Sequence, residues 1–345
     1  MRKTSEAALA ALMAAAPMLA AAEPVAISVT ATAETTGTRG DTDDPAIWVN
    51  PDDPAASLIL GTDKTQGLYV YDLVGRELQF FADGELNNVD LRPFVLDGRQ
   101  VFVAGATKRD GEAILLYVVE DGVVRRASPF AHAPVPDDLS ATVDDIYGFA
   151  MGKSGTDTWV LVNYKSGHVV QWRLTAEGGE IALEFARILA VESQPEGMLV
   201  DDVAGHIYLG EEDRGIWRFP LSPDAEPVAT AIDTIPSACL PRDDVEGLAI
   251  WDGGQERYLV ASAQGIHRAA IYRLDGEAVP DCVALVEIGA GAVDGVTETD
   301  GLDVTARPVG PDYPEGLLVM MDDQNAGFTT NFKLIGWTEI GAKLR

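Results

Sequence analysis

Basic residues are scarce in this chain of 345 residues, which has 25 Lys and Arg against 55 Asp and Glu and a formal net charge of −30. So large an acidic excess argues against binding to nucleic acid or to an anionic membrane surface, because both carry negative charge. It also makes the folded chain repel itself. Bound cations relieve such repulsion, so the composition favours a protein that requires metal ions.

Histidine and the common catalytic motifs are also sparse. The four histidines are scattered along the chain without the spacing of a zinc site. The chain contains no Gly-x-Ser-x-Gly elbow and no phosphate-binding glycine loop. These absences argue against zinc chemistry and leave no evident covalent nucleophile.

Long apolar runs are absent except at the N-terminus. There Met1-Arg2-Lys3 precedes an Ala-rich apolar stretch from Ala7 to Ala22, which is typical of a secretory signal peptide cleaved before Glu23. A short membrane anchor is the alternative, but the run is short and is interrupted by Pro17. We therefore expect residues 1–22 to be a signal peptide and the protein to be secreted or periplasmic.

The chain has two cysteines, Cys239 and Cys282. An exported protein folds in an oxidising compartment, where a disulfide between them is expected. Two free buried thiols are the alternative.

The sequence is rich in one repeated phrase, in which a polar residue precedes a short apolar strand and two more strands follow. It occurs six times, at a spacing of roughly 50 residues. The phrases begin at Asp44-Pro45-Ala46, Asn88-Val89-Asp90, Ile146-Tyr147-Gly148, Gln194-Pro195-Glu196, Val245-Glu246-Gly247 and Thr299-Asp300-Gly301. Each unit has room for four strands. We therefore predict an all-β fold, a six-bladed β-propeller with four antiparallel strands per blade, as a single domain over residues 23–345.

The last unit shows only three clear strands before Trp337. We expect the stretch from Val25 to Ala33 to supply its missing outer strand, so that an N-terminal strand closes the ring and removes an exposed edge. A disordered leader is the alternative.

In a propeller, equivalent positions of successive blades converge around the axis. The repeat would therefore gather oxygen-bearing side chains at one end of the channel: Asp43, Asp44, Asn88, Asp90, Tyr147, Glu196, Glu246 and Asp300. Carboxylates packed in this way repel one another unless cations lie between them. Ligand sets made only of oxygen favour calcium over zinc.

The turn after the second strand of each unit divides the ring by charge. Units one to three carry Lys64, Arg109 and Lys165 there. Units four to six carry Glu211-Glu212-Asp213, Ser262-Ala263-Gln264 and Asp322-Asp323-Gln324. A scaffold needs no such segregation, whereas a site for a polyanion and metal ions does.

Taken together, the motifs resemble those of the β-propeller (alkaline) phytases. They are Asp43-Asp44-Pro45-Ala46-Ile47-Trp48, Leu86-Asn87-Asn88-Val89-Asp90-Leu91-Arg92, Tyr147-Gly148-Phe149, Glu196-Gly197-Met198, Glu211-Glu212-Asp213, Asp244-Val245-Glu246-Gly247-Leu248 and Thr299-Asp300-Gly301-Leu302-Asp303. The resemblance covers almost the whole chain after the N-terminal stretch. It implies a six-bladed propeller that uses calcium ions to bind and hydrolyse phytate, an inositol hexakisphosphate.

The resemblance also implies roles for individual residues. The implied ligands of calcium at the cleavage site are Asp43, Tyr147, Glu196, Glu212, Asp244 and Glu246, and the implied phosphate-holding residues are Lys64, Arg109, Lys165 and Gln264. Further expected metal ligands, structural or at the rim, are Asp44, Asn88, Asp90, Glu211, Asp213, Asp300 and Asp303. Those expected to be catalytic are Lys64, Arg109, Tyr147, Lys165, Glu196, Glu212 and Glu246.

We thus expect a monomeric, calcium-dependent phosphoric monoester hydrolase of the 3-phytase type, acting on phytate and lower inositol phosphates. One phosphate would lie at a cleavage site, where a metal-bound water attacks phosphorus, and a neighbouring phosphate would lie at an affinity site. Two alternatives remain open. One is a calcium-stabilised binding propeller without catalysis, because a fold alone does not fix function; the other is a calcium-dependent lactonase or esterase.

Overall fold

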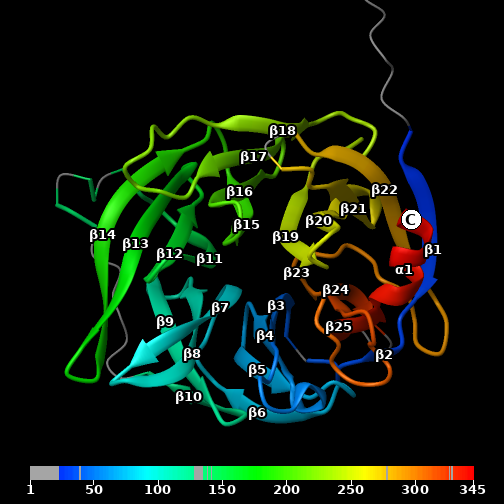
Figure 1. Cartoon of the computed structure of the whole chain (residues 1–345), viewed down its shortest axis with the longest axis horizontal. Coiled ribbons are helices and arrows are strands. Elements are labelled where there is room, and N and C mark those ends of the chain that lie inside the picture. The colour runs from blue at the N-terminus through cyan, green and yellow to red at the C-terminus, as the bar shows by residue number, and fades with distance from the viewer. Residues whose placement is uncertain are drawn as a thin grey trace, which may run out of the picture.

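A computed structural model describes residues 23–38, 40–127, 135–137, 139–140, 142–276, 279–325, 327 and 329–345. The expected signal peptide lies outside these residues. The described residues form six sheets arranged as blades in a ring, as Figure 1 shows. The predicted six-bladed β-propeller is therefore confirmed.

Each blade is a meander whose first strand is innermost. Blade 1 consists of β3 (Thr42–Trp48), β4 (Leu58–Asp63), β5 (Gly67–Tyr71) and β6 (Glu77–Phe81). Blade 2 consists of β7 (Leu86–Leu96), β8 (Arg99–Lys108), β9 (Ala113–Glu120) and β10 (Val123–Arg126). Blade 3 consists of β11 (Ile146–Ser154), β12 (Asp157–Tyr164), β13 (His168–Glu177) and β14 (Glu180–Ala190).

The second half of the ring follows the same plan. Blade 4 consists of β15 (Pro195–Asp201), β16 (His206–Glu211), β17 (Gly215–Pro220) and β18 (Thr230–Thr234). Blade 5 contains β19 (Val245–Asp252), β20 (Arg257–Ala263), β21 (Arg268–Arg273) and β22 (Asp281–Gly289), and blade 6 contains β23 (Leu302–Thr305), β24 (Leu317–Asn325) and β25 (Thr329–Gly336). Short 3-10 turns η1 (Pro54–Ala56) and η2 (Gln264–Ile266) and a terminal helix α1 (Trp337–Leu344) complete the described elements.

The core lies between the blades, which is why the strands read as nearly continuous apolar runs. Successive side chains of a strand point to opposite faces of its sheet. In β4, Leu60 packs among residues of blade 2, whereas Ile59 packs against Val319 and Phe332 of blade 6. Both side chains are fully buried. Each blade therefore stabilises two neighbours at once, and the ring fixes where every inner strand begins.

The N-terminal segment closes the ring, as predicted, but it does so with two short strands. Only β2 (Ala33–Glu34) completes blade 6, where it pairs antiparallel with β25. The preceding β1 (Val25–Thr30) pairs in parallel with β22 and becomes a fifth strand of blade 5. Ile27 and Val29 bury their side chains in the adjoining core, so the stretch supports two blades rather than one.

The C-terminal helix α1, which the sequence did not predict, packs beside β1 (Figure 1). Trp337 and Ile340 enter the core between blades 5 and 6. Elsewhere in blade 5, Cys239 and Cys282 form the expected disulfide. No helix among the described residues is long and apolar enough to cross a membrane.

Candidate metal and phosphate site

A β-bulge recurs at the start of the inner strand in blades 1 to 5. In each, two residues of the inner strand stand opposite one residue of the second strand. The bulged pairs are Asp43-Asp44, Asn87-Asn88, Tyr147-Gly148, Glu196-Gly197 and Glu246-Gly247. Bulges re-aim side chains and are frequent beside functional sites. Here the same irregularity places a polar side chain at the same point of each blade, and these residues form a rim around the axis.

Glycine at the second bulge position lets neighbouring blades touch. A Cβ added to Gly148 would lie 2.1 Å from the carbonyl oxygen of Glu196, and one added to Gly197 would lie 1.9 Å from that of Glu246. The backbone of the neighbouring blade is so close that no side chain fits at Gly148 or Gly197. The Tyr-Gly and Glu-Gly pairs of the sequence therefore bring successive rim residues side by side.

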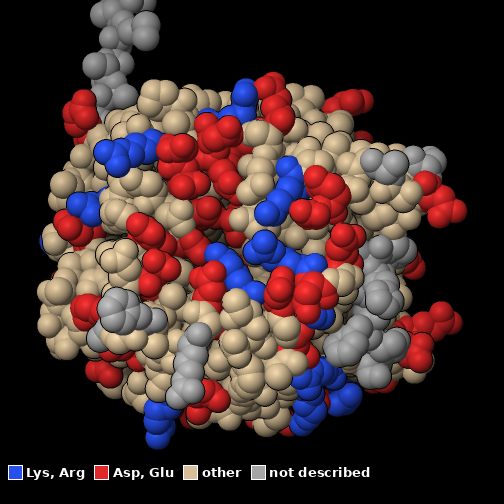
Figure 2. All heavy atoms as spheres, turned by 180° about the vertical axis from the view of Figure 1, so that it is seen from behind, with Lys and Arg blue, Asp and Glu red and all other residues tan. Residues whose placement is uncertain are grey.

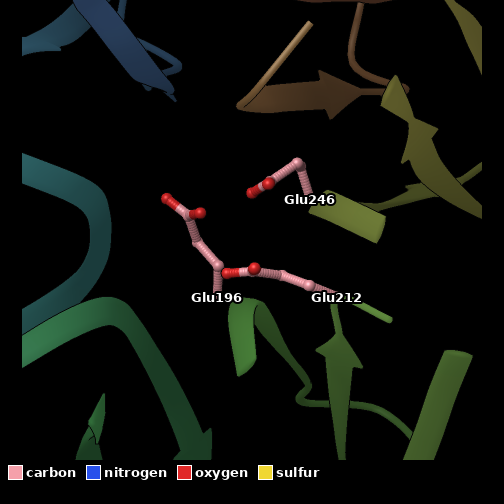
Figure 3. Close-up of side chains that lie close together, drawn as sticks. All are labelled: Glu196, Glu212 and Glu246. Carbon is pink, nitrogen blue, oxygen red and sulfur yellow. The ribbon is translucent and has the colours of Figure 1, made fainter. Parts of the chain in front are cut away.

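The rim contains a cluster of three carboxylates, from Glu196, Glu212 and Glu246. One oxygen from each lies within 4.8 Å of the others, and Figure 3 shows the three side chains close together. Glu196 is 3 % exposed and Glu246 is 6 % exposed. Repulsion between three acids this close opposes their full ionisation, and a cation among them would relieve it.

Their pKa values show how the cluster balances its charge without a metal. Burial, and then the charge of Glu196, raises the pKa of Glu246 well above its usual range. Burial works against Glu196, but hydrogen bonds from Glu246 and Tyr147, with the charge of Lys64, hold its pKa below the ordinary value. Burial also raises the pKa of Glu212 to about 7. Burial and mutual repulsion thus oppose full ionisation of the three acids.

A second part of the rim pairs a lysine with two acids. The Lys64 ammonium lies 3.2 Å from Oδ1 of Asp43 and 2.6 Å from Oδ2 of Asp300. Gln264 donates a hydrogen bond to the other oxygen of Asp300. Asp43 is fully buried, and burial raises its pKa well above the usual range. Burial raises the pKa of Asp300 to about 6.

The third part of the rim is cationic. Arg109 and Lys165 lie on the Tyr147 ring, at 5.7 and 4.8 Å from its centroid. Among the described residues, no carboxylate lies close enough to Arg109 or Lys165 to form an ion pair. Both side chains are therefore available to an anion. They line a hollow that also includes Glu85, Glu112 and Asp145. Figure 2 shows Asp and Glu side chains crowding the middle of one face of the ring, with Lys and Arg side chains beside them.

The predicted equivalence of the rim turns is confirmed by their backbone. The amides of Lys64, Arg109, Lys165, Glu212 and Gln264 each donate to the carbonyl of a residue just before the inner strand of the same blade. The five residues therefore occupy equivalent positions on the same face of the ring. The cationic and acidic halves seen in the sequence are two halves of one rim.

Four predicted ligands line the channel next to the rim. Asp44 and Asn88 are the second residues of their bulges, and Asp90 and Asp303 line the same hollow. Three of them join neighbouring blades, because Asp44 accepts the amide of Val89, Asp90 that of Met151 and Asp303 that of Ile47. Burial raises the pKa of Asp303 to about 7. Asn88 stays close to Glu196, because the Asn87 amide donates to Oδ1 of Asn88 and to Oε1 of Glu196. A metal-binding role for these residues stays a prediction.

Glu211 and Asp213 also stand apart from the three-carboxylate cluster. Both oxygens of Glu211 have partners, because Oε1 accepts from Ser193 and Oε2 accepts from the Trp217 indole at 2.6 Å. The Ser193 amide donates to Glu211, which leaves the Ser193 hydroxyl to donate to Oδ1 of Asp213 at 2.6 Å. Asp244, by contrast, lies near the cluster, where burial and the charges of Asp243 and Glu196 raise its pKa.

Sequence reasoning missed two amides that hold the cluster. Asn87 donates to Oε1 of Glu196 at 2.8 Å, and Gln194 donates to Oε1 of Glu212 at 2.6 Å. Asn87 is fully buried and occupies the bulge position equivalent to Asp43 and Tyr147. The sequence pattern had selected Asn88, one residue away, for that place.

Comparison with known proteins identifies relatives of this chain. A family model described as Phytase matches residues 2–345. The 3-phytase of Bacillus subtilis (strain 168) is 35 % identical over 314 residues, which cover 88 % of this chain and 81 % of that protein. A crystal structure of the β-propeller domain of Myceliophteria thermophila Cps50 (Swd1) covers 86 % of this chain and 85 % of its own, at 12 % identity and a TM-score of 0.48. That last likeness carries no argument about function.

Proposed function

Because this chain belongs to the phytase family and is a phosphoric monoester hydrolase, we propose that its rim binds calcium ions together with phytate. The observation that carries the proposal is the cluster of Glu196, Glu212 and Glu246 beside Arg109 and Lys165. The three carboxylates favour bound metal ions, and the two cationic side chains favour a bound anion. A phosphate ester that binds together with metal ions would provide both charges.

The residues at the rim fit a hard cation. Oε2 of Glu246 and Oδ2 of Asp43 are buried and lack any hydrogen-bond partner. Unpaired buried carboxylate oxygens are costly, and oxygen-only donor sets favour calcium. The proposed ligands are Asp43, Tyr147, Glu196, Glu212, Asp244, Glu246 and Asp300. When bound, calcium would supply positive charge that activates water and offsets the charge of the phosphate.

The remaining rim residues act on the substrate. Arg109 and Lys165 bind a phosphate, and the planar guanidinium suits two phosphate oxygens at once. Lys64 and Gln264 reach the phosphate next to the carboxylate cluster and steady the charge that develops on its oxygens. Phytate carries neighbouring phosphates, so one can occupy the cleavage site while another is held at the affinity site.

The acids outside the rim receive other proposed roles. Asp44, Asn88, Asp90 and Asp303 remain candidate ligands for a structural calcium in the channel. Asp44, Asp90 and Asp303 also join neighbouring blades. Glu211 and Asp213 are proposed as supports, because Ser193 and Trp217 occupy their oxygens.

The protein is proposed to work outside the cytoplasm, as a monomer with a single catalytic domain over residues 23–345. The disulfide between Cys239 and Cys282 supports this, because such bonds persist in oxidising compartments. Residues 1–22 would direct export and be removed, leaving a secreted or periplasmic enzyme.

The proposal is tested by measuring phosphate release from phytate in calcium, in EDTA, and after calcium is restored. We expect activity to disappear with EDTA and to return with calcium. A lactone and a simple aryl ester serve as control substrates and should not be hydrolysed at a comparable rate. Phosphate release that is indifferent to EDTA would contradict the calcium proposal while leaving the hydrolase assignment intact.

A further inference from the structure

Opposite each bulge stands one residue of the second strand, and in four blades this residue is polar and fully buried. These residues are Thr62, Thr107, Asn163 and Ser262. Gly210 holds the place in blade 4. A bulge leaves backbone groups of its strand without ladder partners. Buried polar groups need partners, so a polar side chain at this position has a defined task.

The side chains are bonded to the backbone that carries the rim residues. Thr107 donates to the carbonyl of Tyr147, and Ser262 donates to the carbonyl of Thr299, the neighbour of Asp300. Both bonds cross from one blade to the next. The hydroxyls therefore fix the rim of the following blade without reaching the rim themselves.

Asn163 joins two rim positions at once. Its Oδ1 accepts the amide of Gly148 at 2.7 Å, and its Nδ2 donates to the carbonyl of Glu196 at 2.6 Å. Gly148 follows Tyr147 directly, so a single amide links the backbone of Tyr147 to that of Glu196. The side chains of Tyr147 and Glu196 are also hydrogen bonded to each other. Exchanging the amide oxygen and nitrogen of Asn163 would break both bonds, because the Gly148 amide needs an acceptor and the Glu196 carbonyl needs a donor.

We infer that Asn163 is a positioning residue, which sets the spacing between Tyr147 and Glu196 and thereby the metal affinity of the rim, with Thr107 holding Tyr147 from the other side. The inference rests on the proposed metal site. Residues behind metal ligands orient them, and ligand positions must be held within about 0.5 Å. An amide that bonds both backbones meets that need.

A buried amide elsewhere between blades 3 and 4 provides a matched control. Gln171 is fully buried in β13 and donates to the carbonyl of Leu221 at 3.0 Å, while its oxygen accepts from Arg187. Like Asn163, it joins these two blades through its amide. It belongs to the third strand, away from the rim. Gln171→Leu should therefore lower stability without touching the metal site.

The test measures metal affinity and stability separately, on the full mature chain. Terbium(III) is the probe, and its luminescence is excited through nearby aromatic side chains. The luminescence from the rim is identified as the fraction that is lost in Glu246→Gln and that added calcium abolishes. The variants are Asn163→Asp, Asn163→Ala, Thr107→Val and Gln171→Leu. Thermal unfolding in EDTA reports stability for each.

We expect Asn163→Asp and Asn163→Ala to weaken terbium binding at the rim about tenfold or more. Thr107→Val, which keeps its shape, should give a smaller loss and remains informative if the asparagine variants do not fold. Gln171→Leu should lower the unfolding temperature with unchanged terbium affinity.

Two outcomes would overturn the inference. The first is a wild-type terbium affinity in every Asn163 and Thr107 variant that folds. The second is a loss of terbium affinity in Gln171→Leu as large as the loss in the Asn163 variants. If the wild-type protein itself bound neither terbium nor calcium at the rim, the proposed function would fail as well. That result is distinct from one in which only the Asn163 variants behave like wild type.

Discussion

The ammonium of Lys64 lies 2.6 Å from Oδ2 of Asp300. The same ammonium lies 3.2 Å from Asp43, so in the metal-free rim it neutralises two acids that we propose as ligands. Burial opposes the charge on Lys64, but Asp43 and Asp300 raise its pKa far above the ordinary value. A residue expected to act on the substrate thus also pairs with two proposed metal ligands.

Replacing this lysine should therefore change metal binding and substrate binding in opposite directions. Lys64→Met removes a positive charge close to the proposed ligands, which should lower the calcium concentration for half-saturation by about tenfold. It should also weaken the use of phytate and raise KM. Calcium binding by calorimetry and steady-state kinetics measure the two effects. A higher calcium requirement in Lys64→Met would show that the lysine does not compete with metal.

The pH dependence of stability should reverse when calcium is bound. Glu246 and Asp43 have raised pKa values, as do Glu212 at about 7 and Asp300 at about 6. Between about pH 5 and about pH 8 the metal-free folded protein thus binds more protons at the rim than the unfolded chain does, and stability falls as pH rises. Calcium requires the deprotonated acids, so its stabilising effect grows over the same range.

Unfolding temperatures measured in EDTA and in saturating calcium, from about pH 5 to about pH 8, test this sign. We expect the EDTA curve to fall with pH and the gap between the curves to widen. Glu212→Gln and Glu246→Gln should flatten the EDTA curve. An EDTA curve that rises through the window would refute the assignment of protons to the rim.

Ring closure depends on a buried lysine. Lys333 in β25 has no exposed surface, and its ammonium contacts Glu34 of β2, Asp294 and Asp322. It therefore ties the N-terminal segment to blade 6 and to the loop that follows blade 5. Lys333→Met removes the cation and leaves three acids together, which should cost about 3 kcal/mol of unfolding free energy.

Urea unfolding in EDTA measures that loss, with Arg173→Met as the control. Arg173 pairs with Glu184 on an exposed strand, and surface pairs contribute little. The control should leave the midpoint unchanged. Equal midpoints for Lys333→Met and the wild type would mean that the lysine does not secure the closure.

The strand pattern was readable because each blade is buried on both faces, which makes Val, Ile and Leu recur wherever a strand runs. The rim residues were readable because the bulge repeats, as in Tyr147-Gly148 and Glu196-Gly197. Asn87 was missed because a bulge shifts the register by one residue, and the letters Asn87-Asn88 do not say which amide contacts Glu196. The division of the N-terminal stretch into β1 and β2, which serve different blades, depends on pairings with residues far along the chain.

Side-chain roles that depend on neighbours were also hidden. Glu211 and Glu212 are adjacent acids, but only the fold shows that the indole of Trp217 occupies the first and that the second joins Glu196 and Glu246. Lys333 looks like a strand residue in the sequence. Asp322 lies on the neighbouring strand β24, but Glu34 comes from the other end of the chain and Asp294 from the loop after blade 5.

The most direct test of the account is Glu246→Gln, measured for calcium binding by calorimetry and for phosphate release from phytate across free calcium concentrations. The substitution keeps the shape of the side chain and removes a ligand charge from the three-carboxylate cluster. We predict a folded protein whose calcium affinity falls about tenfold or more and whose turnover nearly vanishes at calcium levels that saturate the wild type. Wild-type turnover and wild-type calcium affinity in Glu246→Gln would contradict the claim that these acids hold the catalytic metal.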